Sequence, residues 1–318
     1  ASFIGGGSGG SGGSGSGSGH ANDHMITVEA GSLEETLNPP DLLTVTGQKE
    51  GWFVSRHNLT LTERRPFSCG TICAVYRGRH KNHSLAVKMP KNPRDIIAFK
   101  SVIREIDILR DLKHPNVVSF IGACFDSLRG PMLMIEEYKN GTLEDLLTQA
   151  QVKLKDDAHL QGSAVDRYIC SGLTEELHDV SKLHAMGVDL PSMIQIGIEM
   201  MQCLAYLHSL TPPIMHRDIK PSNIFLNGKG GTKIGDFGFS TRVHSSEISS
   251  DGPVGTYRYM APEIVLDSPY YLSADMYSAG VVLLYAFTGR QPYSGCTWGD
   301  VFYSASYGLH ILNQYESG

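Results

Sequence analysis

The chain has 318 residues, 41% of them hydrophobic and 19% charged, and its formal net charge is −6. This length and composition suffice to bury the core of one large domain or two small ones. The mild acidity gives no reason to expect nucleic acid as a partner, and the longest apolar run, residues 279–287, is too short to span a bilayer. The six cysteines form no CxxC pair, which favours reduced thiols in a cytoplasmic protein over a disulfide or zinc scaffold.

The N-terminal stretch has the composition of a linker. Residues 5–19 contain only Gly and Ser, which cannot bury a core, and Leu37–Asp41 adds turn chemistry without hydrophobic periodicity. We therefore expect residues 1–50 to form a disordered Gly/Ser-rich linker. Because the chain begins at Ala1 rather than Met, an upstream receptor or membrane region stays open as an alternative. The expected location is the cytoplasm, either free or as the cytoplasmic portion of a membrane receptor.

Ordered structure is expected to begin near Gly51, and short β-type runs dominate as far as residue 138. Strands are predicted at residues 59–62, 73–76, 84–88, 117–120 and 131–138. One helix interrupts them, because apolar residues recur at steps of three and four between Ile97 and Leu112. Pro115 ends that helix, since proline cannot continue it.

The second half of the chain turns helical. Thr142 is placed to cap a short helix over residues 142–147, and Pro191 occupies a favoured first-turn position of an amphipathic helix over residues 191–208. An irregular stretch, about residues 151–189, separates the two. A strand-rich half joined to a helix-rich half predicts an α+β chain of two lobes, with a ligand-binding cleft between them.

The most informative stretch is HRDIKPSNIFLNGKGGTKIGDFG, which runs from His216 to Gly238. Phosphoryl transfer needs a carboxylate to orient the attacking hydroxyl, and acidic and amide oxygens to hold Mg²⁺. Asp218, Asn223 and Asp236 supply these groups in the order that protein kinases use. The number of residues matched at fixed spacing makes this a strong signal.

From about Trp52 to about Tyr293, the chain resembles a eukaryotic protein kinase domain. Residues 114–123 and the end of the activation segment, residues 255–263, are most similar to the tyrosine-kinase-like group. This group includes the Raf and mixed-lineage kinases and is mostly serine/threonine-specific.

The resemblance implies a bilobal α+β fold, with a small β-rich N-lobe at residues 51–138 and a larger helical C-lobe at residues 139–318. The stretch at about residues 151–189 is then an insertion. By family comparison further helices follow Gly318, so the C-lobe is expected to lack its last helices. A fragment cut there is expected to be unstable, because the apolar helix over residues 273–288 loses its cover.

The resemblance also implies the catalytic residues. Asp218 is the expected catalytic base, Lys220 approaches the transferring phosphoryl group, and Lys88 with Glu105 forms the ion pair of the active arrangement. Lys220 and Thr256 are typical of serine/threonine kinases. The implied reaction transfers the γ-phosphate of ATP to serine or threonine of a protein substrate.

ATP and Mg²⁺ are the implied cofactors. Asn223 and Asp236 are the expected metal ligands, and Asp275 matches the aspartate that braces the catalytic loop. Four side chains are expected to stack between the lobes, namely Leu109, Phe120, His216 and Phe237.

The residues expected to bind the nucleotide or its metal ions are Ser68, Gly70, Val75, Ala86, Lys88, Glu137, Lys139, Asn223, Phe225 and Asp236. In the family, the adenine is sandwiched at the positions of Val75, Ala86 and Phe225. Backbone groups of Glu137 and Lys139 would contact the adenine from the hinge, the segment that joins the lobes.

The phosphate-binding loop departs from the family pattern G-x-G-x-x-G-x-V. Only Gly70 remains in Ser68–Val75, whereas glycine lets the backbone approach phosphates closely. We therefore expect weakened ATP affinity. Cys69 and Cys73 would lie over the nucleotide, and an inert packed thiol is the alternative to a redox-sensing one.

A second departure is Glu136. Alignment of residues 134–138 on the family's hinge puts Glu136 at the gatekeeper position behind the adenine. A buried carboxylate without a partner is costly. Three explanations stay open: an ion pair with Lys88, a hydrogen bond to water, or a register shifted by one residue.

Two functions from different classes follow. The first is an active serine/threonine kinase, because every group that performs the chemistry is present. The alternative is a pseudokinase or scaffold module with weak nucleotide binding, suggested by the loop, by Glu136 and by the end of the chain. Candidate phosphorylation sites, with Arg217 as partner for an added phosphate, are Ser245, Ser246, Ser249 and Ser250.

Overall fold

The computed structural model describes residues 39–81, 83–138, 140–151, 190–226, 231–244 and 255–308. All of them belong to one compact unit, Asn38–Gly318. The Gly/Ser stretch, most of the predicted insertion, Lys139 and the four candidate phosphorylation sites lie outside the described residues.

A helix precedes the predicted start of ordered structure, so the linker predicted over residues 1–50 extends too far. This helix, α1 (Pro39–Glu50), begins with two prolines, which are favoured in a first turn. A Cβ on Gly47 would lie 2.7 Å from the Trp52 ring, so only glycine permits the close approach. Glu50 also forms an ion pair with Arg110 at 2.6 Å. Tertiary contacts, rather than a repeating apolar pattern, hold α1 in place.

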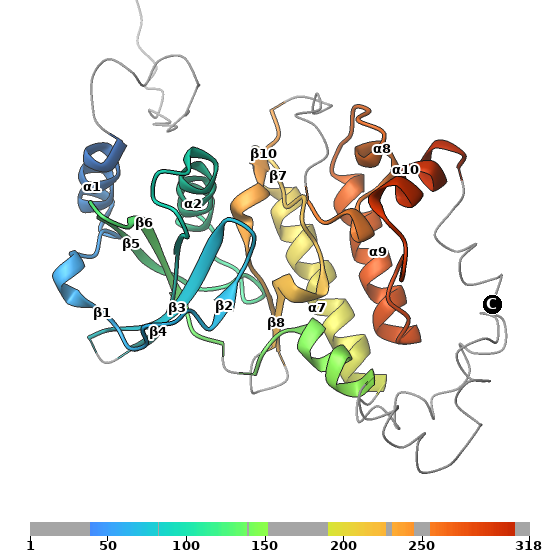
Figure 1. The fold of residues 1–318 in the computed structure, drawn as a ribbon, viewed down its shortest axis with the longest axis horizontal. Helices are drawn as coiled ribbons and strands as arrows, with labels where there is room; N and C mark the ends of the chain where they lie inside the picture. Colours follow the sequence, from blue (N-terminus) through green and yellow to red (C-terminus); the bar gives the residue numbers. More distant parts are fainter. Residues whose placement is uncertain are drawn as a thin grey trace, which may run out of the picture. The chain divides into compact units, whose positions relative to one another are not determined.

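A six-stranded antiparallel sheet forms the N-terminal part (Figure 1). Its strand order is β1-β3-β4-β6-β5, and β2 pairs with β3. The strands are β1 (Leu59–Leu61), β2 (Ser68–Cys69), β3 (Cys73–His80), β4 (His83–Pro90), β5 (Phe120–Asp126) and β6 (Gly130–Glu136).

One long helix, α2 (Ile96–Leu109), contacts this sheet at β4 and β6. Asp95 caps it by accepting hydrogen bonds from the backbone N–H groups of Ile97 and Ala98. Its buried face includes Val102, Glu105 and Leu109. The three- and four-residue periodicity therefore predicted this helix, but the helix ends at Leu109 and does not continue to Pro115.

The strand predicted over residues 117–120 is misplaced, since β5 begins at Phe120. Val117 and Val118 are buried, but they pair with Ile234 in the C-terminal part instead of joining the sheet. Their apolar, β-branched side chains fit either partner equally well, which is why the local sequence did not distinguish the two.

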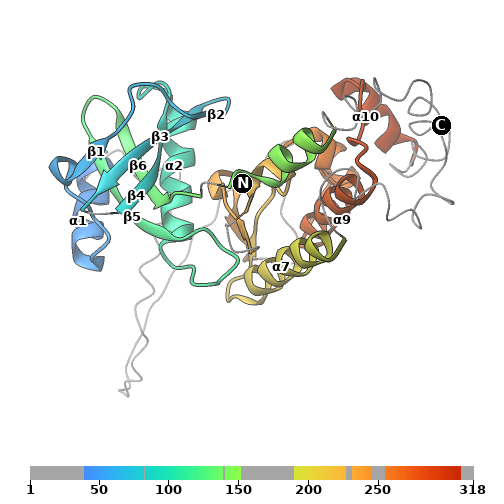
Figure 2. The ribbon, with the colours of Figure 1, turned by 90° about the horizontal axis from the view of Figure 1, so that it is seen from below.

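The C-terminal part is built on two long helices, α7 (Leu190–Ser209) and α9 (Ser273–Thr288), which contact one another (Figure 2). A helix over residues 143–151 and the shorter α8 (Pro262–Val265) and α10 (Trp298–Ser306) accompany them. As predicted, Thr142 caps the first of these by accepting from the Asp145 N–H.

Short strands and 3₁₀ turns occur in the loops that connect the longer elements. The strands form two pairs, β7 (Ile214–Met215) with β10 (Thr241–Arg242), and β8 (Ile224–Leu226) with β9 (Thr232–Ile234). The turns are η1 (Arg56–Asn58), η2 (Pro221–Asn223), η3 (Phe237–Phe239) and η4 (Tyr257–Tyr259). Within the described residues, no helix is both long and apolar enough to cross a bilayer.

Candidate active site

Asp275 on α9 fixes the backbone of the catalytic loop, residues 216–223. Its Oδ2 accepts a hydrogen bond from His216 N at 2.8 Å, and its Oδ1 accepts one from Arg217 N at 2.9 Å. Arg217 has a φ of 66°, a left-handed conformation that costs free energy in a residue with a side chain. The Asp275 carboxylate is 1% exposed, so a buried anion stabilises this strained turn.

His216 connects the catalytic loop to the segment after β9. Its Nδ1 accepts from the backbone N–H of Asp218, and its Nε2 donates to the carbonyl of Gly235 at 3.2 Å. Burial lowers the pKa of His216, although several nearby carboxylates oppose the shift. The imidazole is therefore neutral, with its proton on Nε2.

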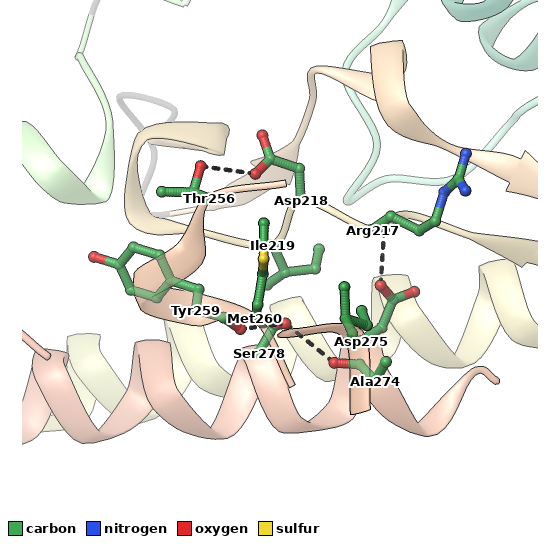
Figure 3. Close-up of a pocket in the computed structure, with 10 residues that line it drawn as sticks. Arg217, Asp218, Ile219, Thr256, Tyr259, Met260, Ala274, Asp275 and Ser278 are labelled. Carbon is green, nitrogen blue, oxygen red and sulfur yellow. Dashed lines mark hydrogen bonds between the residues drawn. The ribbon is translucent and has the colours of Figure 1, made fainter. Parts of the chain in front are cut away.

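Three side chains hold the carboxylate of Asp218. Oδ2 accepts from Lys220 Nζ at 2.7 Å and from Asn223 Nδ2 at 3.1 Å. Oδ1 accepts from Thr256 Oγ1 at 2.9 Å (Figure 3). Lys220 Nζ also lies 2.9 Å from Thr256 Oγ1, so the four side chains form one closed network. Hydrogen bonds to both oxygens orient the carboxylate before any substrate arrives.

A small cavity of about 10 Å³ lies between the catalytic loop and α9 (Figure 3). It is lined by Arg217, Asp218, Ile219, Thr256, Tyr259, Met260, Ile264, Ala274, Asp275 and Ser278. A volume near 10 to 15 Å³ holds about one water molecule. The cavity is therefore a packing gap below the network, not a binding site.

A second charged network joins the sheet, α2 and the turn η3. Lys88 Nζ lies 2.6 Å from Glu105 Oε2 and 2.7 Å from Asp236 Oδ1. Glu105 Oε1 accepts from the backbone N–H of Phe237 at 3.1 Å. The pair predicted between Lys88 and Glu105 is thus formed, and it extends to Asp236, which lies 148 residues beyond Lys88 in the sequence.

The charges of Lys88 and Asp236 stabilise one another. Burial by itself would lower the pKa of Lys88, but the carboxylates of Asp236 and Glu105 outweigh it and raise the pKa. Burial also opposes ionisation of Asp236, yet the Lys88 ammonium lowers its pKa to about 2. Burial raises the pKa of Glu105, with Lys88 and the Phe237 N–H opposing that shift.

Asn223 and Asp236 offer oxygen atoms of the kind that Mg²⁺ prefers. The Asp236 carboxylate is 38% exposed and ionised. Asn223 donates its amide N–H groups to Asp218, which leaves the amide oxygen as a possible metal ligand. Among the described residues, no three His, Cys, Asp or Glu side chains form a metal cluster. One carboxylate and one amide suit a Mg²⁺ ion that takes its remaining ligands from phosphates and water.

The strand register defines which side chains face the nucleotide. Val75 pairs with Lys88, and Ala86 lies two residues from Lys88 on the same strand. Cross-strand partners and residues two apart share a face of a sheet. Val75, Ala86 and Lys88 therefore lie on one face.

The same register corrects the position of the gatekeeper. Ile135 on β6 pairs with Ala86 and shares its face, whereas Glu136 pairs with Leu85 and belongs to the opposite face. Glu136 is exposed, and its Oε2 accepts from the Tyr138 hydroxyl at 3.2 Å. Of the three explanations left open for Glu136, the strand register supports the one-residue shift, because Glu136 lies on the face opposite to Ala86 and Lys88. Lys88 forms its ion pairs with other carboxylates.

The remaining hinge and adenine residues are described only in part. Glu137 is half-buried and forms an ion pair with Arg77, while Lys139 is outside the described residues. Phe225 on β8 lies beside the hinge, with its ring centroid 5.8 Å from that of Tyr138. The backbone contacts and the sandwich predicted for adenine remain predictions.

The phosphate-binding loop is a hairpin between β2 and β3. Ser68, Cys69 and Gly70 are exposed, and Gly70 N donates to Cys73 O at 3.0 Å. A Cβ on Gly70 would meet only that oxygen, at 3.6 Å, so this turn does not require glycine. Cys73 is buried, and burial raises the pKa of its thiol to about 11. Cys73 is therefore the inert packed thiol, not a reactive one.

Two side chains near the site were missed from sequence. Tyr270 accepts a hydrogen bond from Arg217 Nη1 at 3.2 Å, and Arg77 pairs with Glu137 and Glu63. These partners are 53, 60 and 14 residues away, so no local spacing marks them. The one indication in the sequence that Arg77 has a role was its charge in the middle of a strand.

The amino-acid sequence matches the protein kinase domain over residues 65–305. The chain belongs to the protein kinase family. This confirms the predicted family and its bilobal α+β fold. The stack predicted for kinases is present in part, because the rings of His216 and Phe237 lie 4.7 Å apart and Leu109, Phe120 and Phe237 pack in one hydrophobic cluster.

Several kinases are similar to this domain. Serine/threonine/tyrosine-protein kinase HT1 of Arabidopsis thaliana is 26% identical over 256 residues, which are 79% of this chain and 56% of HT1. Serine/threonine-protein kinase STY17 of the same plant is 26% identical over 253 residues, 79% of this chain and 37% of STY17. Wall-associated receptor kinase-like 5, also from Arabidopsis, is 31% identical over 233 residues, 73% and 27% of the two chains. The chain thus spans about half or less of the length of these relatives.

The function predicted from sequence agrees with these matches. The kinase domain and the names of its relatives support an ATP-dependent protein serine/threonine kinase with Mg²⁺ as its cofactor ion. They do not favour the pseudokinase alternative. A kinase domain acts on protein substrates, so the expected class of substrate is supported as well.

Proposed function

We propose that this kinase domain transfers the γ-phosphate of ATP to serine and threonine side chains of protein substrates. The observation that carries the proposal is the closed network of Asp218, Lys220, Thr256 and Asn223. The network orients the Asp218 carboxylate, with the Lys220 ammonium beside it, to receive the hydroxyl of a substrate.

Each residue has a distinct role in this proposal. Asp218 orients the substrate hydroxyl and accepts its proton as the oxygen bonds to the γ-phosphorus, while the bond from that phosphorus to the β,γ-bridging oxygen breaks and ADP leaves. Lys220 compensates the negative charge of the transferring group. Lys88, held by Glu105, binds phosphate oxygens of the nucleotide.

Asn223 and Asp236 would hold the metal ion. When bound, Mg²⁺ neutralises charge on the β- and γ-phosphates. Asp236 is suited to this role because its low pKa keeps it anionic at neutral pH. The Lys88 ammonium that keeps it so lies 2.7 Å from Asp236 Oδ1, so it would contact the same phosphates as the metal ion.

The experiment is a phosphoryl-transfer assay with γ-labelled ATP and Mg²⁺ on three matched peptides that differ only in Ser, Thr or Tyr at the acceptor. We expect transfer to the Ser and Thr peptides and little to the Tyr peptide. The Asp218→Asn variant should bind nucleotide but not transfer phosphate. Equal transfer by the variant would exclude the assigned role of Asp218, and binding without transfer by the wild type would revive the pseudokinase alternative.

We further propose that the domain acts in the cytoplasm, where ATP and reduced thiols coexist. Cys69, Cys73, Cys124 and Cys203 form no disulfide. One relative is named as a receptor kinase, so the domain could form the cytoplasmic portion of a longer receptor. Fractionation of the full-length tagged protein tests both ideas, because a receptor remains with membranes after a high-salt wash.

A further inference from the structure

Arg77 on β3 joins three separate segments of the N-lobe. Its Nε donates to Glu137 Oε1 in the hinge at 2.9 Å, and its Nη1 donates to Glu63 Oε1 at 2.9 Å. Its guanidinium carbon also lies 4.8 Å from the centroid of the Phe67 ring. Glu63 and Phe67 both belong to the connection that leads from β1 into the phosphate-binding loop.

The position of Arg77 places this junction beside the nucleotide site. Arg77 pairs with Ala86 and lies two residues from Val75 on the same strand. It therefore shares the face on which Val75, Ala86 and Lys88 lie. Along β3 the order from the loop is Cys73, Val75 and Arg77, so Arg77 continues the adenine-facing row.

The contact with Phe67 reaches the phosphate-binding loop directly. Phe67 precedes Ser68, the first residue of β2, and its backbone N–H donates to Val75 O at 3.0 Å. Beyond this point the described loop is exposed and contains one glycine. The stacking of Arg77 on Phe67 is thus the last side-chain restraint before the loop turns over the phosphates.

The contact with Glu137 is the firmer of the two ion pairs. The Glu137 side chain is 9% exposed, whereas those of Arg77 and Glu63 are 45% and 43% exposed. A carboxylate so poorly solvated needs a partner, and Arg77 is the one ion-pair partner of Glu137 among the described residues. The guanidinium fork bonds two carboxylates while its flat face covers a ring, which an ammonium cannot do.

We propose that Arg77 is a positioning residue that sets ATP affinity by tying the phosphate-binding hairpin to the hinge. The proposal rests on the proposed function for its kinetic readout, and on nucleotide binding for an independent one. Arg77 supplies a side-chain restraint from the sheet to a hairpin in which Ser68 to Thr71 are exposed. Because Arg77 does not touch the Asp218 network, its loss should weaken ATP binding and leave the chemical step intact.

The test compares Arg77→Ala with Arg79→Ala in the full chain. Arg79 is the matched control because it is exposed, lies two residues further on the same face of β3, and forms no ion pair with any described residue. We expect Arg77→Ala to raise both KM for ATP and the Kd of a fluorescent ATP analogue about three- to tenfold, with kcat within about twofold. Arg79→Ala should change neither.

Two further variants separate positioning from general damage. Arg77→Lys keeps the charge but loses the fork and the stacking, so its KM should lie between those of wild type and Arg77→Ala. Glu137→Gln should raise KM for ATP, and adding Arg77→Ala to it should cost less than Arg77→Ala costs alone. Thermal unfolding of each variant shows whether the fold is retained.

The outcomes distinguish this proposal from the proposed function. Equal Kd values for wild type, Arg77→Ala and Arg79→Ala overturn the positioning role, as does a fall in kcat at unchanged KM. An Arg77→Ala variant that unfolds is replaced by Arg77→Lys, and an unchanged Kd for that folded variant overturns the role as well. If the Kd of the analogue depends on Arg77 but the wild type transfers no phosphate, the proposed function alone is overturned.

Discussion

The catalytic loop and the phosphate-binding loop are built in opposite ways. The two oxygens of Asp218 accept hydrogen bonds from Lys220 and Thr256. The buried Asp275 fixes the backbone beside Asp218. The hairpin from Ser68 to Cys73 is exposed for most of its length and has one internal backbone hydrogen bond, from Gly70. One region is held from several sides, and the other is held mainly at its ends.

From this contrast we expect catalysis and nucleotide affinity to depend on separate parts of the domain. Changes in the Asp218 network should act on the transfer step, whereas changes around the hairpin should act on binding. Lys88 belongs to both, because it bonds Asp236 near the chemistry and lies on the nucleotide-facing side of the sheet. Four sets of variants or labelling measurements test this separation.

Asp218→Asn should have the largest effect. The amide cannot accept the substrate proton, so we expect kcat to fall roughly 10²- to 10⁴-fold, with the Kd for ATP unchanged within about twofold. Lys220 and Thr256 keep their hydrogen-bonding groups in this variant. Steady-state kinetics and analogue binding measure the two quantities. A parallel loss of ATP binding would contradict the separation of the two regions.

Lys88→Met should lower both the stability of the fold and kcat. It removes the cation that lies between Glu105 and Asp236, and Glu105 is 2% exposed on its side chain. Breaking a buried ion pair costs about 3–5 kcal/mol of stability, and loss of one electrostatic group in an active site costs on the order of 10²-fold in kcat. Urea unfolding and kinetics check these values. Glu105→Gln is the milder companion, because Lys88 keeps Asp236; an equal loss in both variants would argue against the three-membered network.

Asp275→Ala should act mainly through the fold. It leaves the backbone N–H groups of His216 and Arg217 without their acceptors, so we expect a loss of about 2–4 kcal/mol in the free energy of unfolding. Asp275→Asn keeps one acceptor oxygen and should lose about half as much. Urea unfolding measures both. Equal stability of the two variants would show that charge, not hydrogen bonding, is what braces the loop.

The two loop cysteines should differ in reactivity, and this is the smallest effect. The pKa of Cys73 is raised from 9.0 to about 11 by burial. Its thiol therefore contributes stability that is fully present below pH 9 and is lost as the pH rises through 11. In native protein at pH 8, iodoacetamide should label exposed Cys69 and spare Cys73, as mapped by mass spectrometry. Equal labelling of both would show that the hairpin opens more readily than its hydrogen bond with β3 suggests.

The chemistry of the site and the clearest helices could be predicted from the amino-acid sequence. The spacing of Asp218, Asn223 and Asp236 identified a kinase without any structure, because phosphoryl transfer demands those groups in that order. The helix over residues 273–288, which the resemblance to kinases implied, coincides with α9. Gly289 follows it in a left-handed conformation.

Strand pairings could not be predicted from the sequence, because the partners lie far apart along the chain. Val117 and Val118 read as strand, yet pair with Ile234. A one-residue shift moves every side chain of a strand to the other face. The pairing of β4 with β6 therefore puts Ile135, and not Glu136, on the face of Ala86.

The ion pairs of Arg77 and the helix α1 show the same limit for contacts. Neither has a local pattern, because each is stabilised by residues brought close by the sheet: Glu137 for Arg77, and Trp52 and Arg110 for α1. Local sequence specifies which groups are present and how a segment tends to fold. Packing sets the distance between groups that lie far apart along the chain. The proposed effect of Arg77 on ATP affinity depends on such distances.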